Sequence, residues 1–171
     1  MMITEAEFAD LEQILELQYL AYQSEAILYN DFSIPPLTQT IGEIRQEYEK
    51  CIFLKATSNN GDIIGSVRAS IDSDTAYIGR LIVHPEAQGQ GIGTRLMKAI
   101  EQKCAATRYE LFTGDKSIKN LRFYEHLGYV RFIEKEVADG LTFVYMEKYV
   151  NNVKIGSQPL PLSHNSAQFW D

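Results

Sequence analysis

The residues whose types and spacing most clearly suggest a binding site lie between positions 81 and 96. Three glycines alternate there, at Gly89, Gly91 and Gly93, and a segment of helical periodicity follows them. Glycines let the backbone approach an anion closely and turn several N–H groups toward it. The N-terminus of a helix adds unpaired N–H donors and the positive end of the helix dipole. The spacing therefore predicts a strand–loop–helix unit that binds a pyrophosphate group.

Two other phosphate-binding motifs do not fit this loop. A P-loop ends in Gly-Lys-Ser/Thr, whereas Gly93 is followed by Thr94-Arg95. A dinucleotide-binding fold alternates strands and helices and places an acidic residue about 20 positions later. Glu110 lies in that region, but the chain before the loop has the pattern of a strand meander. A glycine-rich connection without a ligand stays open, because alternating glycines alone are a weak indication.

The apolar periodicity predicts an α+β domain around this loop. Helical spacing covers residues 6–28, and Thr38 is expected to cap a second helix that carries Ile41, Ile44 and Tyr48. We expect strands at 3–4, 51–56, 63–71, 75–83, 109–113, 129–137 and 141–149, and further helices at 92–105 and 116–127. The strands at 51–56, 63–71 and 75–83 are joined by short turns, which predicts an antiparallel meander.

Composition narrows the class of protein. The 171 residues suggest one domain, and 16 basic against 23 acidic residues give a net charge of −7. This charge argues against nucleic-acid and anionic-membrane partners and suits a cationic substrate. No signal peptide or membrane-spanning run is expected, and Cys51 and Cys104 fit free thiols in a reducing compartment. We therefore expect a cytoplasmic protein.

Two sequence blocks resemble the GNAT superfamily of acyl-CoA-dependent N-acyltransferases. Gln88-x-x-Gly91-x-Gly93, preceded by an apolar strand and His84-Pro85, resembles the coenzyme A signature of that family. The segment 120–129 resembles the family's late helix, which ends in Tyr-x-x-x-Gly-aromatic. The resemblance covers roughly residues 3–149. It implies a mixed, mostly antiparallel central sheet flanked by helices and splayed at the coenzyme A site.

The resemblance also implies an activity and its residues. Acetyl-CoA would donate its acetyl group directly to a primary amine, expected on a small molecule, and Tyr124 would protonate the leaving thiolate. The expected coenzyme-binding residues are Leu81, Ile82 and Val83 on the strand, Gln88, Gly89, Gln90, Gly91, Ile92, Gly93 and Thr94 in the turn, and Ser117 and Asn120 beyond it. Arg95 is more simply read as an exposed helical residue.

The chain departs from the family pattern at two positions. Many relatives carry an asparagine seven residues before the tyrosine, where this chain has Ser117; Asn120 is an alternative coenzyme contact. Some relatives carry a glutamate base on the strand before the loop, where this chain has Tyr77. The base is therefore unassigned: a water chain, Glu25 and Asp31 are candidates, although a solvated surface role is favoured for both carboxylates.

Some alternatives and boundaries remain open at this stage. His126 and His164 lack partners at ligand spacing, so no metal is expected, and a lone histidine such as His84 at a strand end is more often structural than catalytic. The rival to an enzyme is a catalytically silent acyl-CoA-binding sensor or interaction module of the same fold.

We expect residues 1–150 to form the acetyltransferase domain. The extension 151–171, with Phe169 and Trp170, would pack on that domain or on a partner subunit, as in a homodimer.

Overall fold

A seven-stranded sheet organises residues 1–150, the part of the chain that this computed structural model describes. The strands are β1 (Met2–Glu5), β2 (Ile52–Thr57), β3 (Ile63–Asp72), β4 (Thr75–Val83), β5 (Arg108–Gly114), β6 (Val130–Ala138) and β7 (Leu141–Tyr149). Their order in the sheet is β1-β2-β3-β4-β5-β7-β6. Every neighbouring pair is antiparallel except β4 and β5. The α+β class and the antiparallel β2–β3–β4 meander are thus confirmed.

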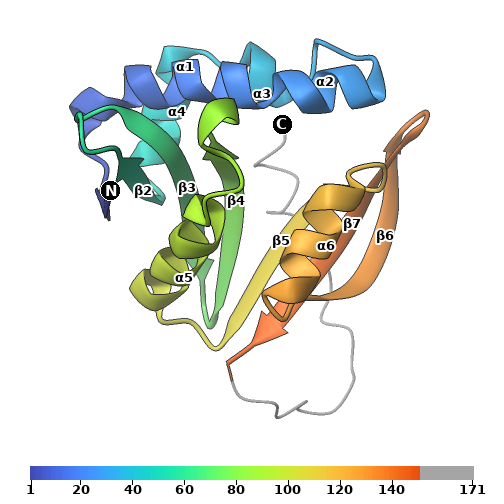
Figure 1. Cartoon of the computed structure of the whole chain (residues 1–171). Coiled ribbons are helices and arrows are strands. Elements are labelled where there is room, and N and C mark those ends of the chain that lie inside the picture. Colours follow the sequence, from blue (N-terminus) through green and yellow to red (C-terminus); the bar gives the residue numbers. More distant parts are fainter. Residues whose placement is uncertain (151–171) are drawn as a thin grey trace.

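The parallel pair β4/β5 is short, and the sheet opens beside it. Only Thr75 to Tyr77 of β4 pair with Arg108 to Glu110 of β5. Beyond these residues the two strands diverge, as Figure 1 shows from their meeting point toward helix α2. β5 instead pairs along its whole length with β7. The splay separates the β1–β4 half of the sheet from the β5–β7–β6 half.

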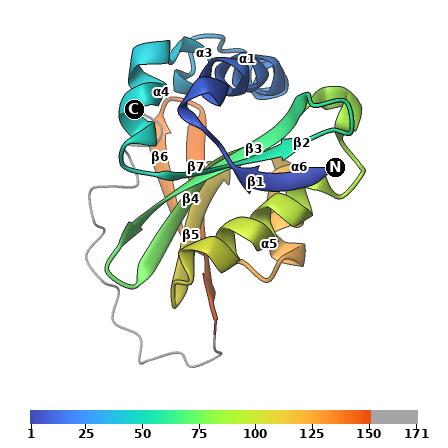
Figure 2. The ribbon, with the colours of Figure 1, turned by 90° about the vertical axis from the view of Figure 1, so that its left-hand side faces the viewer.

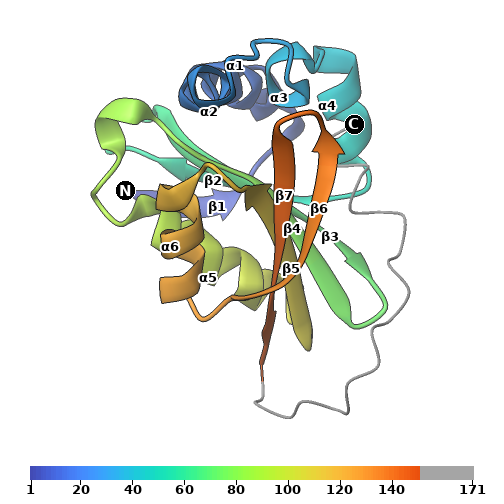
Figure 3. The same cartoon turned by 90° about the vertical axis from the view of Figure 1, so that its right-hand side faces the viewer.

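Helices cover both faces of the sheet. They are α1 (Leu11–Ala21), α2 (Gln23–Tyr29), α3 (Pro35–Thr38), α4 (Ile41–Tyr48), α5 (Ile92–Cys104) and α6 (Ile118–His126), with 3-10 turns η1 (Phe8–Asp10) and η2 (Pro85–Ala87). α5 and α6 lie on the same side of the sheet, and α3 and α4 lie on the other (Figures 2 and 3). α5 buries Ile92, Leu96, Met97, Ile100 and Cys104, a helical spacing that presents one apolar face to the core.

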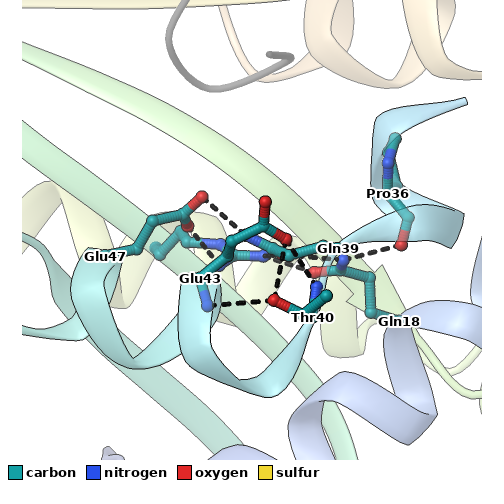
Figure 4. A network of polar contacts seen from close by, with 7 residues as sticks. Gln18, Pro36, Gln39, Thr40, Glu43 and Glu47 are labelled. Atoms are coloured by element: carbon teal, nitrogen blue, oxygen red, sulfur yellow. Dashed lines mark hydrogen bonds and ion pairs between the residues drawn. The ribbon is translucent and has the colours of Figure 1, made fainter.

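A polar network fastens α1, α3 and α4 to β3 (Figure 4). Gln18 of α1 donates to the carbonyl oxygen of Pro36 at 2.8 Å and to Gln39 Oε1 at 3.0 Å, and Gln39 donates to Glu47 at 2.7 Å. The buried Arg68 of β3 donates to both Gln18 and Glu47. Burial lowers the pKa of Arg68 to about 10, and the Glu47 carboxylate opposes that shift. Because each partner satisfies the others, the network fixes the helices that lie over β3 and β4.

Two predicted helix boundaries are wrong. The helix expected over 6–28 is divided into η1, α1 and α2, with the break at Tyr22. Side chains at the break compete with the helix: Ser24 Oγ donates to the Ala21 carbonyl oxygen and Gln23 Nε2 to that of Tyr19. Thr38 ends α3 and does not cap the next helix. Thr40 caps α4, in a capping box with Glu43.

The predictions for the extension 151–171, including His164, Phe169 and Trp170, lie outside the described residues. Among residues 1–150, no helix is both long and apolar enough to cross a bilayer. Within the same range, no three His, Cys, Asp or Glu side chains are grouped so that they could hold a metal ion.

Candidate active site

A cleft of about 730 Å³ occupies the region where β4 and β5 part. Its walls come from the α1–α2 junction, from Ile78 to Val83 of β4, from Phe112 to Gly114 of β5, and from the start of α6. Segments far apart in the sequence therefore meet at one site. Of the predicted site residues, Leu81, Ile82, Val83, Gln88, Ser117, Asn120 and Tyr124 all line it.

The β4 wall is mostly apolar, and Arg80 is its one charged residue. Leu81 and Val83 pack toward α5, whereas Ile82 packs toward α1, as expected for alternating strand residues. The register with β3 shifts between Ser66 and Arg68, so that two β4 residues oppose one β3 residue. A bulge of this kind takes backbone groups out of regular strand pairing and re-aims them. Arg80, at φ 50°, lies in this bulge.

The loop after β4 has the conformation that its glycines permit. Gly89 and Gly91 both adopt φ of 76°, in the left-handed region, and Gly91 is the N-cap residue of α5. An added Cβ at either glycine would meet no atom within 4 Å, so the requirement for glycine is conformational. The space beside these two glycines is therefore open. A pyrophosphate group could approach the helix N-terminus through that space.

The turn residues are not all equally close to the cleft. Gln88 lines it, and its side chain donates to the Val83 carbonyl oxygen at 3.4 Å and accepts from Lys119 Nζ at 3.0 Å. Ile92 is buried in the core, so only its backbone can reach a ligand. Five further residues predicted to bind the coenzyme lie beside the cleft, outside its lining, in the loop and first turn of α5: Gly89, Gln90, Gly91, Gly93 and Thr94.

Close packing joins the two helices that flank the cleft. A Cβ at Gly93 of α5 would lie 3.3 Å from the Phe123 ring of α6. The small residue therefore lets α5 and α6 approach each other. This contact holds the loop next to the helix that carries Tyr124.

Tyr124 is partly buried in the cleft wall, among aromatic and charged neighbours. Its ring packs against Phe123, with ring centroids 5.2 Å apart, and against Tyr129 at 6.1 Å. Burial raises the pKa of Tyr124 above that of an ordinary tyrosine, and the nearby Tyr22 and Glu25 raise it further. The phenol consequently stays protonated at neutral pH and can give its proton to a stronger base.

Ser117 and Asn120 converge on a carboxylate. Ser117 Oγ donates to Glu25 Oε2 at 2.5 Å, and Asn120 Nδ2 lies 3.3 Å from Glu25 Oε1 and 3.5 Å from Thr113 Oγ1. Ser117 occupies the N-cap position of α6, but its side chain makes no capping hydrogen bond. Glu25 belongs to α2, so these contacts join the two sides of the cleft.

A second contact from α2 holds the same region. Tyr29, four residues after Glu25, accepts a hydrogen bond from the Lys116 backbone N–H at 2.9 Å and donates to Asp115 at 3.2 Å. A side chain at Gly114 would collide with the Tyr29 hydroxyl, because an added Cβ would lie 2.0 Å from it. Burial raises the pKa of Tyr29 to about 12. Residues at i and i+4 share one helix face, so α2 presents Glu25 and Tyr29 together to the β5–α6 turn.

The other residues weighed as bases lie elsewhere. Tyr77 lines a separate hollow of about 450 Å³ between α3, α4 and the β3–β4 hairpin. Asp31 is exposed and accepts two hydrogen bonds from Ser33, which lower its pKa. Asp31 is absent from the residues that line the cleft.

The cleft residues that sequence reasoning missed include three polar ones: Arg80, Thr113 and Lys119. Arg80 lines both hollows, and its guanidinium lies over the Tyr22 ring, 5.8 Å from its centroid. Its position directly before Leu81 is the one sequence signal that could have identified it. Lys119 next to Asn120 could similarly have been noted as a cation near the phosphate loop.

Solved acetyltransferases share this fold at low sequence identity. An aminoglycoside 6'-N-acetyltransferase in complex with coenzyme A superposes with a TM-score of 0.69 and 19% identity, over 87% of this chain and 97% of that one. A PaiA N-acetyltransferase from Thermoplasma acidophilum, also with coenzyme A, gives 0.63 and 21%, over 86% of this chain and 98% of the other. At such identities the likeness is one of fold.

Comparison of the sequence with known proteins identifies a relative and a family. UPF0157 protein YqkA of Bacillus subtilis (strain 168) is 25% identical over 138 residues, which are 80% of this chain and 39% of that protein. The chain thus matches well under half the length of that relative. The family model described as an acetyltransferase (GNAT) domain matches residues 22–150. This match includes every residue that lines the cleft except Leu20 and Ala21, and the chain belongs to the GNAT acetyltransferase family.

Proposed function

We propose that this protein transfers the acetyl group of acetyl-CoA directly to the primary amine of a small molecule. The observation that carries the proposal is the pairing of two walls in one cleft. The β4 backbone from Arg80 to Val83, which is bulged at Arg80 and Leu81, lies on one side, and Tyr124, a phenol with a raised pKa, lies on the other. Direct acyl transfer needs both a donor to the thioester oxygen and an acid for the leaving thiolate.

The successive parts of coenzyme A each have a place along the cleft in this proposal. The pantetheine arm would lie along Leu81 to Val83 and hydrogen bond with the strand like an additional strand. The pyrophosphate would occupy the turn from Gln88 to Thr94 at the N-terminus of α5. Lys119, now in contact with Gln88, lies close enough to that turn to add a positive charge. Ser117 and Asn120 would contact the arm from the α6 side.

The reaction then follows from the chemistry of the two walls. A backbone N–H near Leu81 would polarise the thioester carbonyl as negative charge develops on its oxygen. The amine nitrogen attacks the carbonyl carbon, the C–N bond forms and the C–S bond breaks. Tyr124 supplies the proton that the thiolate takes up and is restored from solvent.

Charge supports a cationic acceptor. The chain carries a net charge of −7, which attracts amines that are protonated in water. One solved neighbour of the same fold is an aminoglycoside 6'-N-acetyltransferase, which is named for an amine acceptor. Both points favour a small molecule with more than one amino group.

A thiol-release assay tests the proposal. Acetyl-CoA would be offered with a panel of monoamines, polyamines, aminoglycosides and amino acids, and acetylated products would be identified by mass. We expect thiol release that depends on one class of amine. Coenzyme A binding measured by calorimetry, with no turnover on any amine, would instead favour a silent acyl-CoA sensor. Failure to bind coenzyme A at all would contradict both.

A further inference from the structure

We infer that Glu25 is the general base of this cleft, the group that takes the proton from the attacking amine. The inference rests on the proposed acetyl transfer and supplies the residue that such a reaction lacks on β4, where Tyr77 faces a different hollow. It assigns to α2 a catalytic group, in addition to its part in shaping the cleft.

Elimination within the cleft points to Glu25. Among the described residues that line it, Glu25 is the only carboxylate, and none is a histidine or a cysteine. The other ionisable side chains there are Tyr22, Arg80, Lys116, Lys119 and Tyr124. Protonated guanidinium and ammonium groups have no free electron pair for a proton, and a phenol is a donor at neutral pH. Glu25 alone has the chemistry of a base.

Carboxylates on neighbouring elements are already engaged away from the cleft. Glu47 pairs with Arg68 and Gln39, and Glu43 caps α4. Glu110 of β5 pairs with Arg108 at 2.8 Å. None of the three lines the cleft.

The carboxylate is held in a defined orientation. Ser117 contacts one of its oxygens at 2.5 Å and Asn120 the other at 3.3 Å, while Tyr29 fixes the same face of α2 to the β5–α6 turn. A base that is positioned before substrate arrives loses little entropy during the reaction. Each carboxylate oxygen has a further lone pair, so these bonds do not use up its capacity to accept a proton.

The proposed base, Glu25, and the proposed acid, Tyr124, interact electrostatically. The charge of Glu25 contributes to the raised pKa of Tyr124. Glu25 belongs to α2 and Tyr124 to α6, so the acceptor nitrogen and the thioester sulfur can lie between them. A carboxylate and a phenol in one cleft can serve as the base and the acid that acid–base catalysis requires.

The proton balance closes with these two residues. Glu25 takes one proton from the substrate ammonium and passes it to water, which its partial exposure permits. The free amine attacks, and the nitrogen loses its second proton to the same carboxylate as the tetrahedral adduct collapses. Tyr124 protonates the departing sulfur and recovers its proton from solvent. One proton is released for each acetyl group transferred.

Glu25→Gln tests the inference, because the amide keeps the size of the side chain and one acceptor oxygen. The acceptors would be the best amine from the panel and its hydrazide analogue, whose nitrogen is unprotonated at neutral pH. We expect kcat with the amine, at saturating acceptor, to fall about 100-fold or more. With the hydrazide the fall should be smaller, because only the second of the two protons remains for Glu25 to remove. The dissociation constant for coenzyme A should change little.

Two further measurements complete the design. Formate should restore part of the activity of Glu25→Ala, because it can occupy the space left by the carboxylate. Glu16→Gln is the matched control: it removes the same charge from an exposed position on α1, outside the cleft lining, and should leave both rates unchanged.

Several results would overturn the inference. Equal losses with the amine and the hydrazide, without formate rescue, would mean that Glu25 only holds α2 against α6. A change confined to KM would mean that it only recognises the positive charge of the acceptor. Wild-type turnover with an unchanged rate in Glu25→Gln would defeat this inference alone. Wild-type protein that transfers no acetyl group to any amine would defeat the proposed function with it.

Discussion

Tyr124 shows how the environment of one side chain selects its role. An ordinary tyrosine has a pKa near 10, and both burial and the neighbouring groups raise the pKa of Tyr124 above that value. Raising the pKa of a phenol strengthens its hold on the proton, so ionisation does not remove the acid form in the physiological range. At neutral pH the residue therefore carries the proton that the proposed transfer to the thiolate requires, and it is unsuited to accept a proton from an amine.

Replacement of Tyr124 measures this role directly. In Tyr124→Phe we expect kcat to fall by about 10²-fold, the scale of a lost general acid, with little change in coenzyme A affinity. In the wild type, kcat should show no loss from Tyr124 ionisation up to about pH 10, because its pKa lies above the usual value. Tyr149→Phe, at a tyrosine 43% exposed on β7, is the control. An unchanged kcat in Tyr124→Phe would show that solvent protonates the thiolate.

At this scale the sequence pointed to Tyr124, the proposed acid, but not to the residues around it. Tyr124 could be found because Gly128 and Tyr129 follow it at fixed spacing in one local segment. The contact between Glu25 and Ser117 joins residues 92 positions apart, and no local pattern encodes it. Glu25 could be named only as one of several carboxylates in the first helical region. Its place in the cleft depends on how α2 packs against the β5–α6 turn.

Among the elements, α4 illustrates how a short helix is defined at its start. Thr40 accepts a hydrogen bond from the Glu43 backbone N–H at 3.3 Å, and the Glu43 carboxylate accepts from the Thr40 backbone N–H at 2.6 Å and its hydroxyl at 3.0 Å. These bonds, the backbone one foremost, lower the pKa of Glu43. The cap holds the helix that carries Glu47 to the Arg68 network.

Thr40→Ala should therefore destabilise the protein, by about 1 kcal/mol at neutral pH, as measured by urea unfolding. A carboxylate whose folded-state pKa is lowered contributes stability above its ordinary pKa and loses it as the pH falls through the folded-state value. Part of the Glu43 contribution depends on the Thr40 hydroxyl. The difference between wild type and variant should accordingly shrink below about pH 4.

Thr38→Ala is the informative comparison. Thr38 ends α3, and its hydroxyl makes only a 3.4 Å contact with the Pro35 carbonyl oxygen. We expect a smaller loss of stability than for Thr40→Ala, with no dependence on Glu43 protonation. The reverse order would mean that the helix begins where the sequence alone suggested.

Element boundaries were predictable where turn residues lie at both ends. β4 was predicted at its observed bounds, because Asp72-Ser73-Asp74 precedes it and His84-Pro85 follows it. The break between α1 and α2 was missed, since apolar spacing continues through Tyr22 and the competing hydrogen bonds come from Gln23 and Ser24. Apolar periodicity indicates which face of a helix is buried. It does not indicate where side chains compete for the backbone carbonyl groups and interrupt the helix.

At the scale of the whole molecule, the cleft is a consequence of sheet topology. Three residue pairs join β4 to β5, whereas seven join β5 to β7. The two halves of the sheet are thus held together weakly at the site where the ligand is expected. The splay could be anticipated only through the family resemblance, because strand alternation in the sequence does not tell where two neighbouring strands separate.

This topology makes the binding mode testable by hydrogen exchange. If pantetheine extends β4, coenzyme A should slow exchange of the backbone amides from Leu81 to Val83 and of those in the turn from Gln88 to Thr94. Adenosine 3′,5′-bisphosphate, which lacks the pantetheine arm and the pyrophosphate, should protect neither segment to the same degree. Coenzyme A at 100 times its dissociation constant should also raise the free energy of unfolding by about 2.7 kcal/mol. Equal protection of β4 by the two ligands would contradict an arm bound along the strand, because only coenzyme A can make those hydrogen bonds.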